Sequence, residues 1–281
     1  MERITRRRFL AGGATAGALA VGGAGFAASQ NIHGIRRLLH GRGLLGGPDE
    51  AQPDVAANVG YATLKSGSAA VNYGLYLPSA PASVVLYCLH GRGGNRQNAF
   101  DGIGVHRFVA ARNLPWAVAS LDGGEGFWHR RADDSDTQAD LIDTLMPFVG
   151  SKAPDARSVL MGWSMGGYGA LLILLKHRDL FAGAVANGPS IWSSFGAAAP
   201  GAFDDEADFA ANDVLAGAAS LQGAPVRVDC GEDDPFAGAV EELRTRAPGL
   251  DVNISDGFHE DATWRSFLPA QLDFIQTHVG D

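Results

Sequence analysis

A serine stands between glycines in the run Gly-Trp-Ser-Met-Gly at residues 162–166, after an apolar stretch and before a helical one. A tight turn between a strand and a helix lifts a serine hydroxyl above the sheet, at the amino end of the helix, where developing negative charge is favoured. Gly162 and Gly166 leave room for that turn, and Gly167 adds clearance. The context predicts Ser164 as a nucleophile. Because the bare pattern is common by chance, a glycine-rich turn is the alternative.

A histidine later in the chain is placed to act as the base that a serine nucleophile needs. In sites of this kind the acid and then the histidine follow the serine along the chain, each just after a strand. His259 follows the strand-like run 250–255, whereas the other histidines weighed as bases follow a different strand, precede the serine or lie late in helices. This order predicts His259 as the general base.

The acid is predicted in the turn Gly231-Glu232-Asp233-Asp234-Pro235, which follows the strand-like run 225–230. Asp234 is the fourth residue of a Gly-x-x-Asp turn, and Pro235 fixes the backbone beyond it. We therefore favour Asp234 over Asp233 as the group that orients the histidine. A solvated acidic loop with no part in the chemistry is the other alternative.

Acyl transfer at a serine also needs two backbone N–H groups that face the oxyanion of the tetrahedral intermediate. One should come from the residue after the nucleophile, Met165. The other should come from the glycine-rich loop His90-Gly91-Arg92-Gly93-Gly94, where the N–H of Arg92 is the candidate. A phosphate cradle is the competing interpretation of that loop, but the Gly-Lys-Ser/Thr continuation of such cradles is missing.

The elements that must position these groups alternate between strands and helices. Residues 59–65 and 70–77 alternate apolar and polar side chains and predict an antiparallel pair. The remaining pattern predicts an α/β domain with a mostly parallel sheet. Its strands are expected at 84–89, 116–121, 158–163, 181–186, 225–230 and 250–255, and its helices at 137–149, 165–177, 238–247 and 262–278.

Three features outside these elements could also belong to a site. Phe127, Trp128 and His129 follow a strand at the edge where ligands bind in such sheets, so they could line a pocket or simply pack. The irregular stretch between Trp192 and Ala211 suggests an insertion or lid. The acidic run 133–136 lacks the glycine and terminal glutamate of an EF-hand, so we predict a solvated loop that caps the next helix, and no metal site.

Composition excludes several classes of protein. The chain is 46% hydrophobic and 19% charged, which allows a sizeable core and excludes general disorder. Its formal net charge is −9, and −12 without residues 1–28, so we expect no binding to nucleic acid. Its two cysteines exclude a disulfide scaffold; both fall in strand-like runs and are expected to be buried.

The first 28 residues resemble a twin-arginine export signal. The run Thr-Arg-Arg-Arg-Phe-Leu at residues 5–10 precedes an uncharged stretch whose six glycines make it weakly hydrophobic and a poor helix. A transmembrane anchor is the alternative. Cleavage near Ala27 or Ala28 would leave a linker over 29–55, a catalytic domain over 56–281, and no stable membrane span. The mature protein is expected outside the cytoplasm, secreted, periplasmic or associated with the cell envelope.

Longer runs around these residues are similar to a known family. The run Gly-Trp-Ser-Met-Gly-Gly-Tyr-Gly-Ala-Leu at 162–171, Leu-His-Gly at 89–91 and Gly-Phe-His-x-x-x-x-Trp at 257–264 resemble the "putative esterase" family of α/β-hydrolases. That family includes S-formylglutathione hydrolases, feruloyl esterases and the antigen 85 mycolyltransferases. The resemblance covers about residues 59–281. It implies the α/β-hydrolase fold with helices on both faces of the sheet.

The resemblance also implies a chemistry. It maps Ser164, Asp234 and His259 onto a catalytic triad, and Arg92 and Met165 onto an oxyanion hole. The implied enzyme needs no cofactor and hydrolyses a small-molecule, lipid or sugar ester. Acyl transfer of the antigen 85 type is the alternative, although many of those proteins have a glutamate as the acid and this short chain leaves little room for a long acyl groove. Peptidase or lipase activity, and a catalytically inactive envelope-binding protein, are the remaining alternatives.

Overall fold

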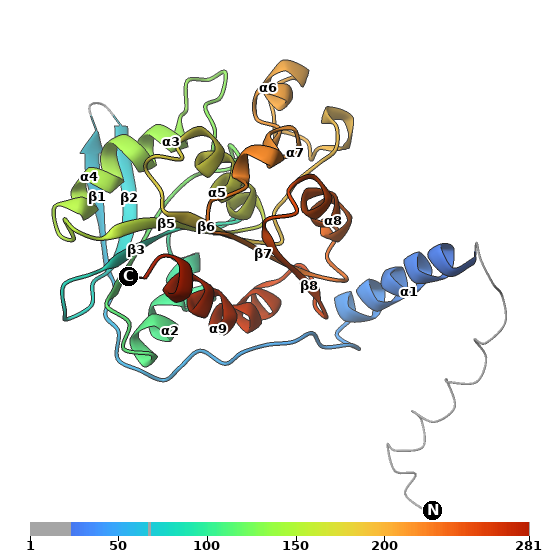
Figure 1. Ribbon diagram of the computed structural model, residues 1–281, viewed down its shortest axis with the longest axis horizontal. Helices are drawn as coiled ribbons and strands as arrows, with labels where there is room; N and C mark the ends of the chain where they lie inside the picture. The colour runs from blue at the N-terminus through green and yellow to red at the C-terminus, as the bar shows by residue number, and fades with distance from the viewer. Residues whose placement is uncertain (1–23, 67–68, 281) are drawn as a thin grey trace, which may run out of the picture. The chain divides into compact units, whose positions relative to one another are not determined.

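The computed structural model describes residues 24–66 and 69–280, and the chain divides into two compact units between Gly46 and Gly47 (Figure 1). The first unit contains helix α1 (Ala24–Gly41). This helix covers the first part of the segment 29–55, for which the sequence predicted no regular element. The apolar residues Ile32, Ile35, Leu38 and Leu39 recur at helical spacing there, despite nearby glycines. The role of the segment as a linker stays a prediction.

The second unit is built on one sheet of eight strands in the order β1-β2-β4-β3-β5-β6-β7-β8. The pairs β1–β2 and β2–β4 are antiparallel, and every other pair is parallel. The antiparallel pair and the mostly parallel sheet predicted from the sequence are confirmed. The strands are β1 (Gly60–Ser66), β2 (Ala69–Tyr76), β3 (Val84–Leu89), β4 (Trp116–Leu121), β5 (Arg157–Trp163), β6 (Gly183–Asn187), β7 (Val226–Gly231) and β8 (Asp251–Ser255).

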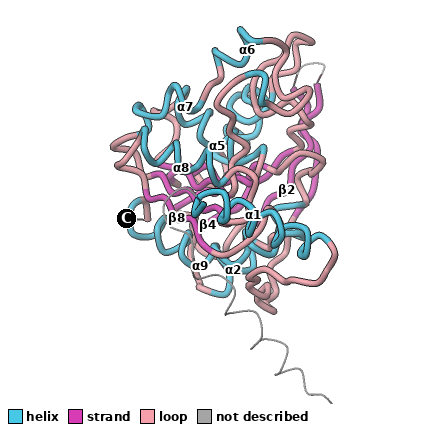
Figure 2. The backbone as a smooth tube through the Cα atoms, turned by 90° about the vertical axis from the view of Figure 1, so that its right-hand side faces the viewer, coloured by secondary structure: helices cyan, strands magenta, loops and turns pink. Residues whose placement is uncertain are grey.

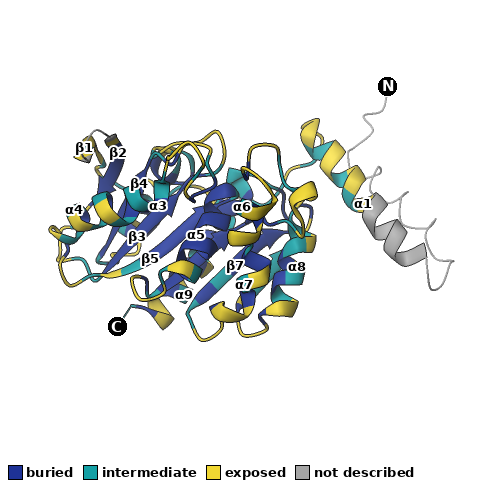
Figure 3. Cartoon of the chain, turned by 90° about the horizontal axis from the view of Figure 1, so that it is seen from above, coloured by how far each residue is buried: buried dark blue, intermediate teal, exposed yellow. Residues whose placement is uncertain are grey.

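The central strands are apolar along their whole length because helices cover both faces of the sheet. In β3, Val85, Tyr87 and Leu89 pack into one buried cluster, whereas the alternate side chains pack into the cluster on the other face. Figure 3 shows these strands as the buried layer of the unit. Such burial fixes the register, because a shift by one residue would exchange the two faces.

Helices α2 (Val105–Ala111) and α9 (Asp261–His278) cover one face of the sheet. Helices α4 (Met146–Gly150), α5 (Met165–Lys176), α7 (Val214–Gly217) and α8 (Ala237–Arg246) cover the other. Figures 1 and 2 show the strands between these two helical layers. Within the described ranges, no helix is both long and apolar enough to cross a bilayer.

The structure differs from the predicted elements in further places. The helix predicted over 137–149 is a short α3 (Thr137–Ala139), a π-helical segment over Asp140–Leu145 and α4. Its cap is Asp136, whose side chain accepts a hydrogen bond from the Ala139 N–H at 3.0 Å, and not the predicted pair of Thr137 and Asp140. Helix α2 and the helix α6 (Glu206–Ala211), inside the predicted irregular stretch, were missed because such short helices carry little periodic signal.

Candidate active site

Ser164 lies in the turn between β5 and α5 with a φ of 56°, a left-handed backbone conformation that is strained for a side chain other than glycine. The two flanking glycines permit this turn. A Cβ on Gly162 would overlap the Gly166 carbonyl, and a Cβ on Gly166 would overlap the Leu89 carbonyl at the end of β3. The sequence pattern around Ser164 is therefore explained by close approach of backbone to backbone.

The loop predicted to stabilise an oxyanion follows β3, the parallel neighbour of β5. Leu89 pairs with Gly162 in this register, so the two strands end together. The Gly94 N–H donates to the Gly91 carbonyl at 3.0 Å, which closes a turn and leaves the Arg92 N–H outside that hydrogen bond. A Cβ on Gly91 would lie 3.4 Å from the Ser164 Cβ. Arg92 thus belongs to a loop that passes beside the nucleophile's turn, and Met165 directly follows Ser164 at the start of α5; their role as amide donors stays a prediction.

His90 holds this loop in place through its ring nitrogens. Its ring Nε2 accepts the Gly123 N–H at 2.8 Å, and its Nδ1 lies 2.7 Å from the Gly91 carbonyl. Burial lowers the pKa of His90, which keeps the imidazole neutral and its Nε2 free to accept. His90 therefore stabilises the turn between the ends of β3 and β4.

The loops after β7 and β8 bring the predicted acid and base to the same edge of the sheet. A Cβ on Gly231 would overlap Gly257, so the two loops are in backbone contact. The Asp233 N–H donates to the Gly257 carbonyl at 3.0 Å, and the Phe258 N–H donates to Thr263 Oγ1 at 3.0 Å. The first bond fixes the two loops on each other just before Asp234, and the second ties the loop after β8 to the first turn of α9 just before His259.

Ser164, His259 and Asp234 form a continuous chain of hydrogen bonds. The His259 Nε2 lies 2.8 Å from Ser164 Oγ, and its Nδ1 lies 2.6 Å from Asp234 Oδ2. A carboxylate only accepts, so Nδ1 carries the proton and Nε2 accepts the Ser164 hydroxyl proton. The second oxygen, Asp234 Oδ1, accepts the Phe236 N–H at 2.8 Å. The structure therefore brings together the three side chains that the sequence singled out.

Two aromatic rings pack against His259. The rings of Phe236 and Trp264 lie 5.3 and 5.0 Å from the imidazole, measured between centroids. Gly188, with a φ of 46°, passes beside the pair, and a Cβ there would lie 2.6 Å from Asp234 Oδ2 and 3.2 Å from His259 Nδ1. The backbone of Gly188 thus packs against the His259–Asp234 pair, and no side chain fits at this position.

A cavity of about 380 Å³ opens beside Ser164 and His259. Most of its other walls are polar or glycine, and Trp264 is the large apolar side chain among them. Burial raises the pKa of Asp261, which also lines the cavity. The lining residues outside the hydrogen-bonded chain are Gly91, Arg92, Gly94, Asn98, Glu260, Asp261 and Trp264.

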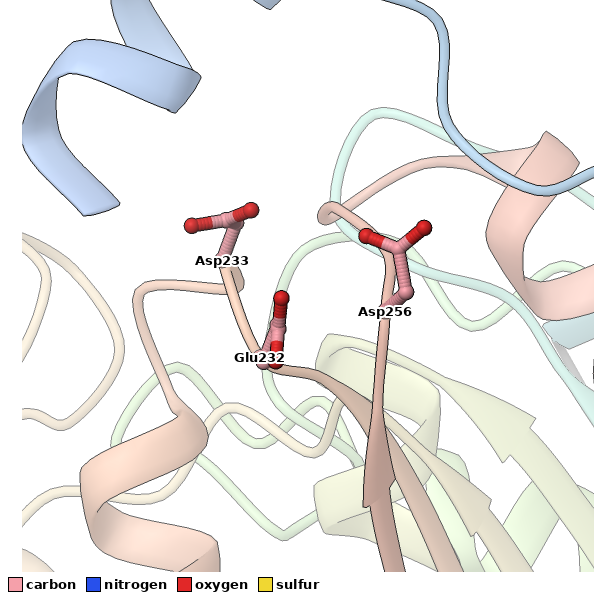
Figure 4. Close-up of side chains that lie close together, drawn as sticks. All are labelled: Glu232, Asp233 and Asp256. Atoms are coloured by element: carbon pink, nitrogen blue, oxygen red, sulfur yellow. The ribbon is translucent and has the colours of Figure 1, made fainter. Parts of the chain in front are cut away.

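Asp233, the alternative acid, faces a different group of side chains. Its carboxylate lies with those of Glu232 and Asp256 at the ends of β7 and β8, all within 4.8 Å of one another (Figure 4). Acidic groups of this kind are common without an ion, and this group by itself does not define a metal site. His259 Nδ1 donates its hydrogen bond to Asp234.

Phe127, Trp128 and His129 are buried, and none of them lines the cavity beside Ser164. Trp128 packs between Gly123 and Gly169, where an added Cβ at either glycine would collide with its ring. Its Nε1 donates to the His90 carbonyl at 3.3 Å. The packing interpretation of this run is therefore confirmed over the pocket-lining one.

The predicted insertion over 192–211 is fastened to the loop before α3. Arg131 Nη2 pairs with Asp204 Oδ1 at 2.8 Å, and the Ala132 N–H donates to Asp204 Oδ2 at 2.7 Å. The buried His129 Nε2 lies 3.1 Å from Asp208 Oδ2. These contacts hold the insertion in one position in this structure.

One contact of the nucleophile was missed by the sequence analysis. The Ser164 Oγ also lies 3.0 Å from the Oγ of Ser190, which follows β6. No local pattern marks this serine, because it meets Ser164 through the pairing of β5 with β6. The one available signal was the strand predicted at 181–186, which places Ser190 in the connection after a strand.

Comparison with known proteins identifies a family for this chain. The family described as "Putative esterase" matches residues 69–275 of the chain. A comparison with curated proteins found no match.

Three solved structures are similar in fold. A ferulic acid esterase is 18% identical, with a TM-score of 0.67 over 79% of this chain and 99% of the other. An S-formylglutathione hydrolase from Agrobacterium tumefaciens is 19% identical, with a TM-score of 0.66 over 83% of this chain and 100% of the other. A fluorophosphonate-binding serine hydrolase of Staphylococcus aureus is 18% identical, with a TM-score of 0.63 over 78% and 98%. The predicted α/β-hydrolase fold is confirmed.

Proposed function

This chain belongs to that esterase family, and on this premise we propose that it is an exported serine esterase that hydrolyses carboxylic esters through an acyl-enzyme on Ser164. The observation that carries the proposal is the hydrogen-bonded chain from Asp234 through His259 to Ser164, with contacts of 2.6 and 2.8 Å. Its direction gives His259 a free lone pair for the Ser164 proton.

In the first half of the reaction, Ser164 Oγ attacks the ester carbonyl as its proton passes to His259 Nε2. The carbonyl oxygen becomes an oxyanion, which the N–H groups of Arg92 and Met165 stabilise. Asp234 stabilises the imidazolium and keeps its Nδ1 proton in place. His259 then gives its Nε2 proton to the leaving alcohol, and Ser164 carries the acyl group.

In the second half, water takes the place of the alcohol. His259 removes its proton as the water oxygen attacks the acyl carbon, and the same two amides stabilise the second oxyanion. The intermediate collapses, Ser164 Oγ leaves and takes back the proton from His259, and the carboxylic acid is released. An acceptor alcohol in place of water would make the same intermediate an acyl donor, which is the acyltransferase alternative.

The cavity supports a small-molecule ester as the substrate. Its volume of about 380 Å³ suits a compact ligand, and the polar side chains among its lining residues can form hydrogen bonds with that ligand. Every step above uses the chain's own side chains and backbone amides, so the proposal includes no cofactor. Export rests on the twin-arginine pattern at residues 5–10, which lies outside the described residues.

Replacing the nucleophile tests the mechanism. We expect Ser164→Ala to abolish hydrolysis of an ester panel of varied acyl length, and labelling by a fluorophosphonate probe, while circular dichroism stays unchanged because only one oxygen is lost. The Ser194→Ala variant, in the loop after β6, is the control and should label normally. Hydrolysis by Ser164→Ala near the native rate would show that Ser164 is not the nucleophile. Measuring the released acid with and without an added alcohol separates hydrolysis from transfer.

A further inference from the structure

A second hydroxyl group lies against the nucleophile. The Oγ atoms of Ser190 and Ser164 are 3.0 Å apart, and the Ser190 N–H donates to the Ser164 carbonyl at 3.1 Å. Ser190 is only 3% exposed and is not among the residues that line the cavity. Its hydroxyl is therefore placed to act on Ser164 itself and not on the body of a bound substrate.

The fold places Ser190 by strand pairing and one tight turn. Strands β5 and β6 are parallel neighbours, with Trp163 opposite Asn187, and the Ser164 N–H donates to the Asn187 carbonyl at 2.8 Å. Gly188, at a φ of 46°, then turns the chain beside Asp234. The same turn that borders the His259–Asp234 pair thus delivers Ser190 to the nucleophile.

Counting hydrogens gives the direction of the contact between the two hydroxyls. Ser164 has one hydroxyl proton, and the unprotonated His259 Nε2 at 2.8 Å takes it. The opposite arrangement would leave Nδ1 without a proton 2.6 Å from the Asp234 carboxylate, where two acceptors would repel. Ser190 is therefore the donor, and Ser164 Oγ accepts its proton through a lone pair.

We propose that Ser190 is a further catalytic residue, whose hydroxyl donates a hydrogen bond to Ser164 Oγ whenever that oxygen carries negative charge. The inference rests on the proposed function of Ser164. Charge develops on this oxygen twice: when His259 takes its proton during attack, and when the oxygen leaves the acyl carbon before it is reprotonated. Ser190 keeps its own proton throughout, so the bonds that form and break are those already given.

Removing the hydroxyl should slow both halves of the reaction alike. A hydrogen bond to a charged group is the stronger kind, so we expect Ser190→Ala to lower kcat and kcat/KM by about 10-fold. The KM should stay within about twofold, because the hydrogen bond is made to Ser164 and not to bound substrate, and it becomes stronger as charge develops in the transition states. The second-order rate constant of fluorophosphonate labelling should fall by a similar factor, since the same oxygen attacks the probe.

Two further comparisons separate this role from packing. Ser120→Ala is the matched control, because Ser120 is also a buried serine, and its Oγ donates to the Cys88 carbonyl at 2.8 Å, away from the site; its kinetics should not change. Ser190→Thr and Ser190→Val have similar shapes and differ in the hydroxyl, so the threonine variant should be several-fold faster than the valine variant. Equal rates for these two variants, or Ser190→Ala within twofold of the wild type, would overturn the proposal.

The experiments give different results if the esterase proposal is wrong and if only the role of Ser190 is wrong. If Ser164→Ala still labels and hydrolyses, Ser164 is not the nucleophile, and both proposals are wrong. If Ser164→Ala is inactive while Ser190→Ala labels at the native rate, the esterase proposal stands and only the role of Ser190 is wrong. The labelling rate needs no knowledge of the natural ester, so both outcomes can be read before the substrate is identified.

Discussion

The orientation of one imidazole decides whether the proposed chemistry can run. His259 accepts the Ser164 proton at Nε2 only because Asp234 holds the other proton at Nδ1. The two oxygens of Asp234 are both used, one by His259 Nδ1 and the other by the Phe236 N–H. Asp234 therefore acts in two ways: its negative charge stabilises the imidazolium, and its oxygens, which only accept hydrogen bonds, keep the proton on Nδ1.

We predict that Asp234→Asn cuts kcat by about 10⁴, by analogy with the same change in serine proteases. The amide oxygen would stay toward the Phe236 N–H, so the amide NH₂ would face His259 Nδ1 and force the proton onto Nε2. Steady-state kinetics on an activated ester would measure the loss. The matched control is Asp233→Asn, whose carboxylate faces Glu232 and Asp256, and its effect should be mild. The reverse ranking would make Asp233 the acid.

The same residues show which parts of the site can be predicted from the sequence. Ser164 and His259 could be predicted, because each lies in the connection after a strand and in a recognisable run. The choice between Asp233 and Asp234 could only be weighed, because adjacent residues of a turn point in different directions and the sequence does not record which. Ser190 could not be predicted, because its contact depends on the pairing of β5 with β6.

At the scale of elements, the site is an edge where the carboxyl ends of parallel strands meet. The turns after β3, β5, β6, β7 and β8 each bring one part of it. The buried strands were predictable because both of their faces are covered and they are continuously apolar. The short helices α2 and α6 and the π-helical segment were not, because they span too few residues for a period to show.

The turn after β6 makes an element-scale prediction. Gly188→Ala would place a Cβ 2.6 Å from Asp234 Oδ2, in a backbone conformation with a φ of 46° that strains alanine. A displacement of about 1 Å in a catalytic group costs on the order of 100-fold in rate, so we expect kcat to fall by about that factor or more. Kinetics together with circular dichroism would separate misplacement from unfolding.

Gly238→Ala is the control for that change. Gly238 is exposed near the start of α8, and a Cβ there would meet no atom within 4 Å. Alanine favours a helix over glycine by about 1 kcal/mol, so this variant should keep full activity and melt slightly higher. Native kinetics in Gly188→Ala would show that the space beside Asp234 is not needed.

At the scale of the whole molecule, the catalytic unit carries all of its proposed chemistry and needs no disulfide. Cys88 and Cys230 are both free and buried, and burial raises the pKa of each thiol. Unreactive thiols on opposite faces of the sheet leave folding independent of an oxidising compartment. Export of the folded chain by a twin-arginine signal stays a prediction, and it can be tested directly.

We therefore predict that Arg6→Lys combined with Arg7→Lys blocks export and leaves an active, full-length precursor in the cytoplasm. Lysine keeps the positive charge but lacks the guanidinium group of arginine, and the arginine pair defines the signal. A block of export in this variant would therefore not result from a loss of positive charge. Cell fractionation with an immunoblot and an esterase assay of each fraction would measure this outcome. The matched control is Arg36→Lys with Arg37→Lys, a neighbouring arginine pair in α1 beyond the predicted signal, which should be exported normally. Unchanged export of the Arg6 and Arg7 variant would show that residues 1–28 are not a twin-arginine signal.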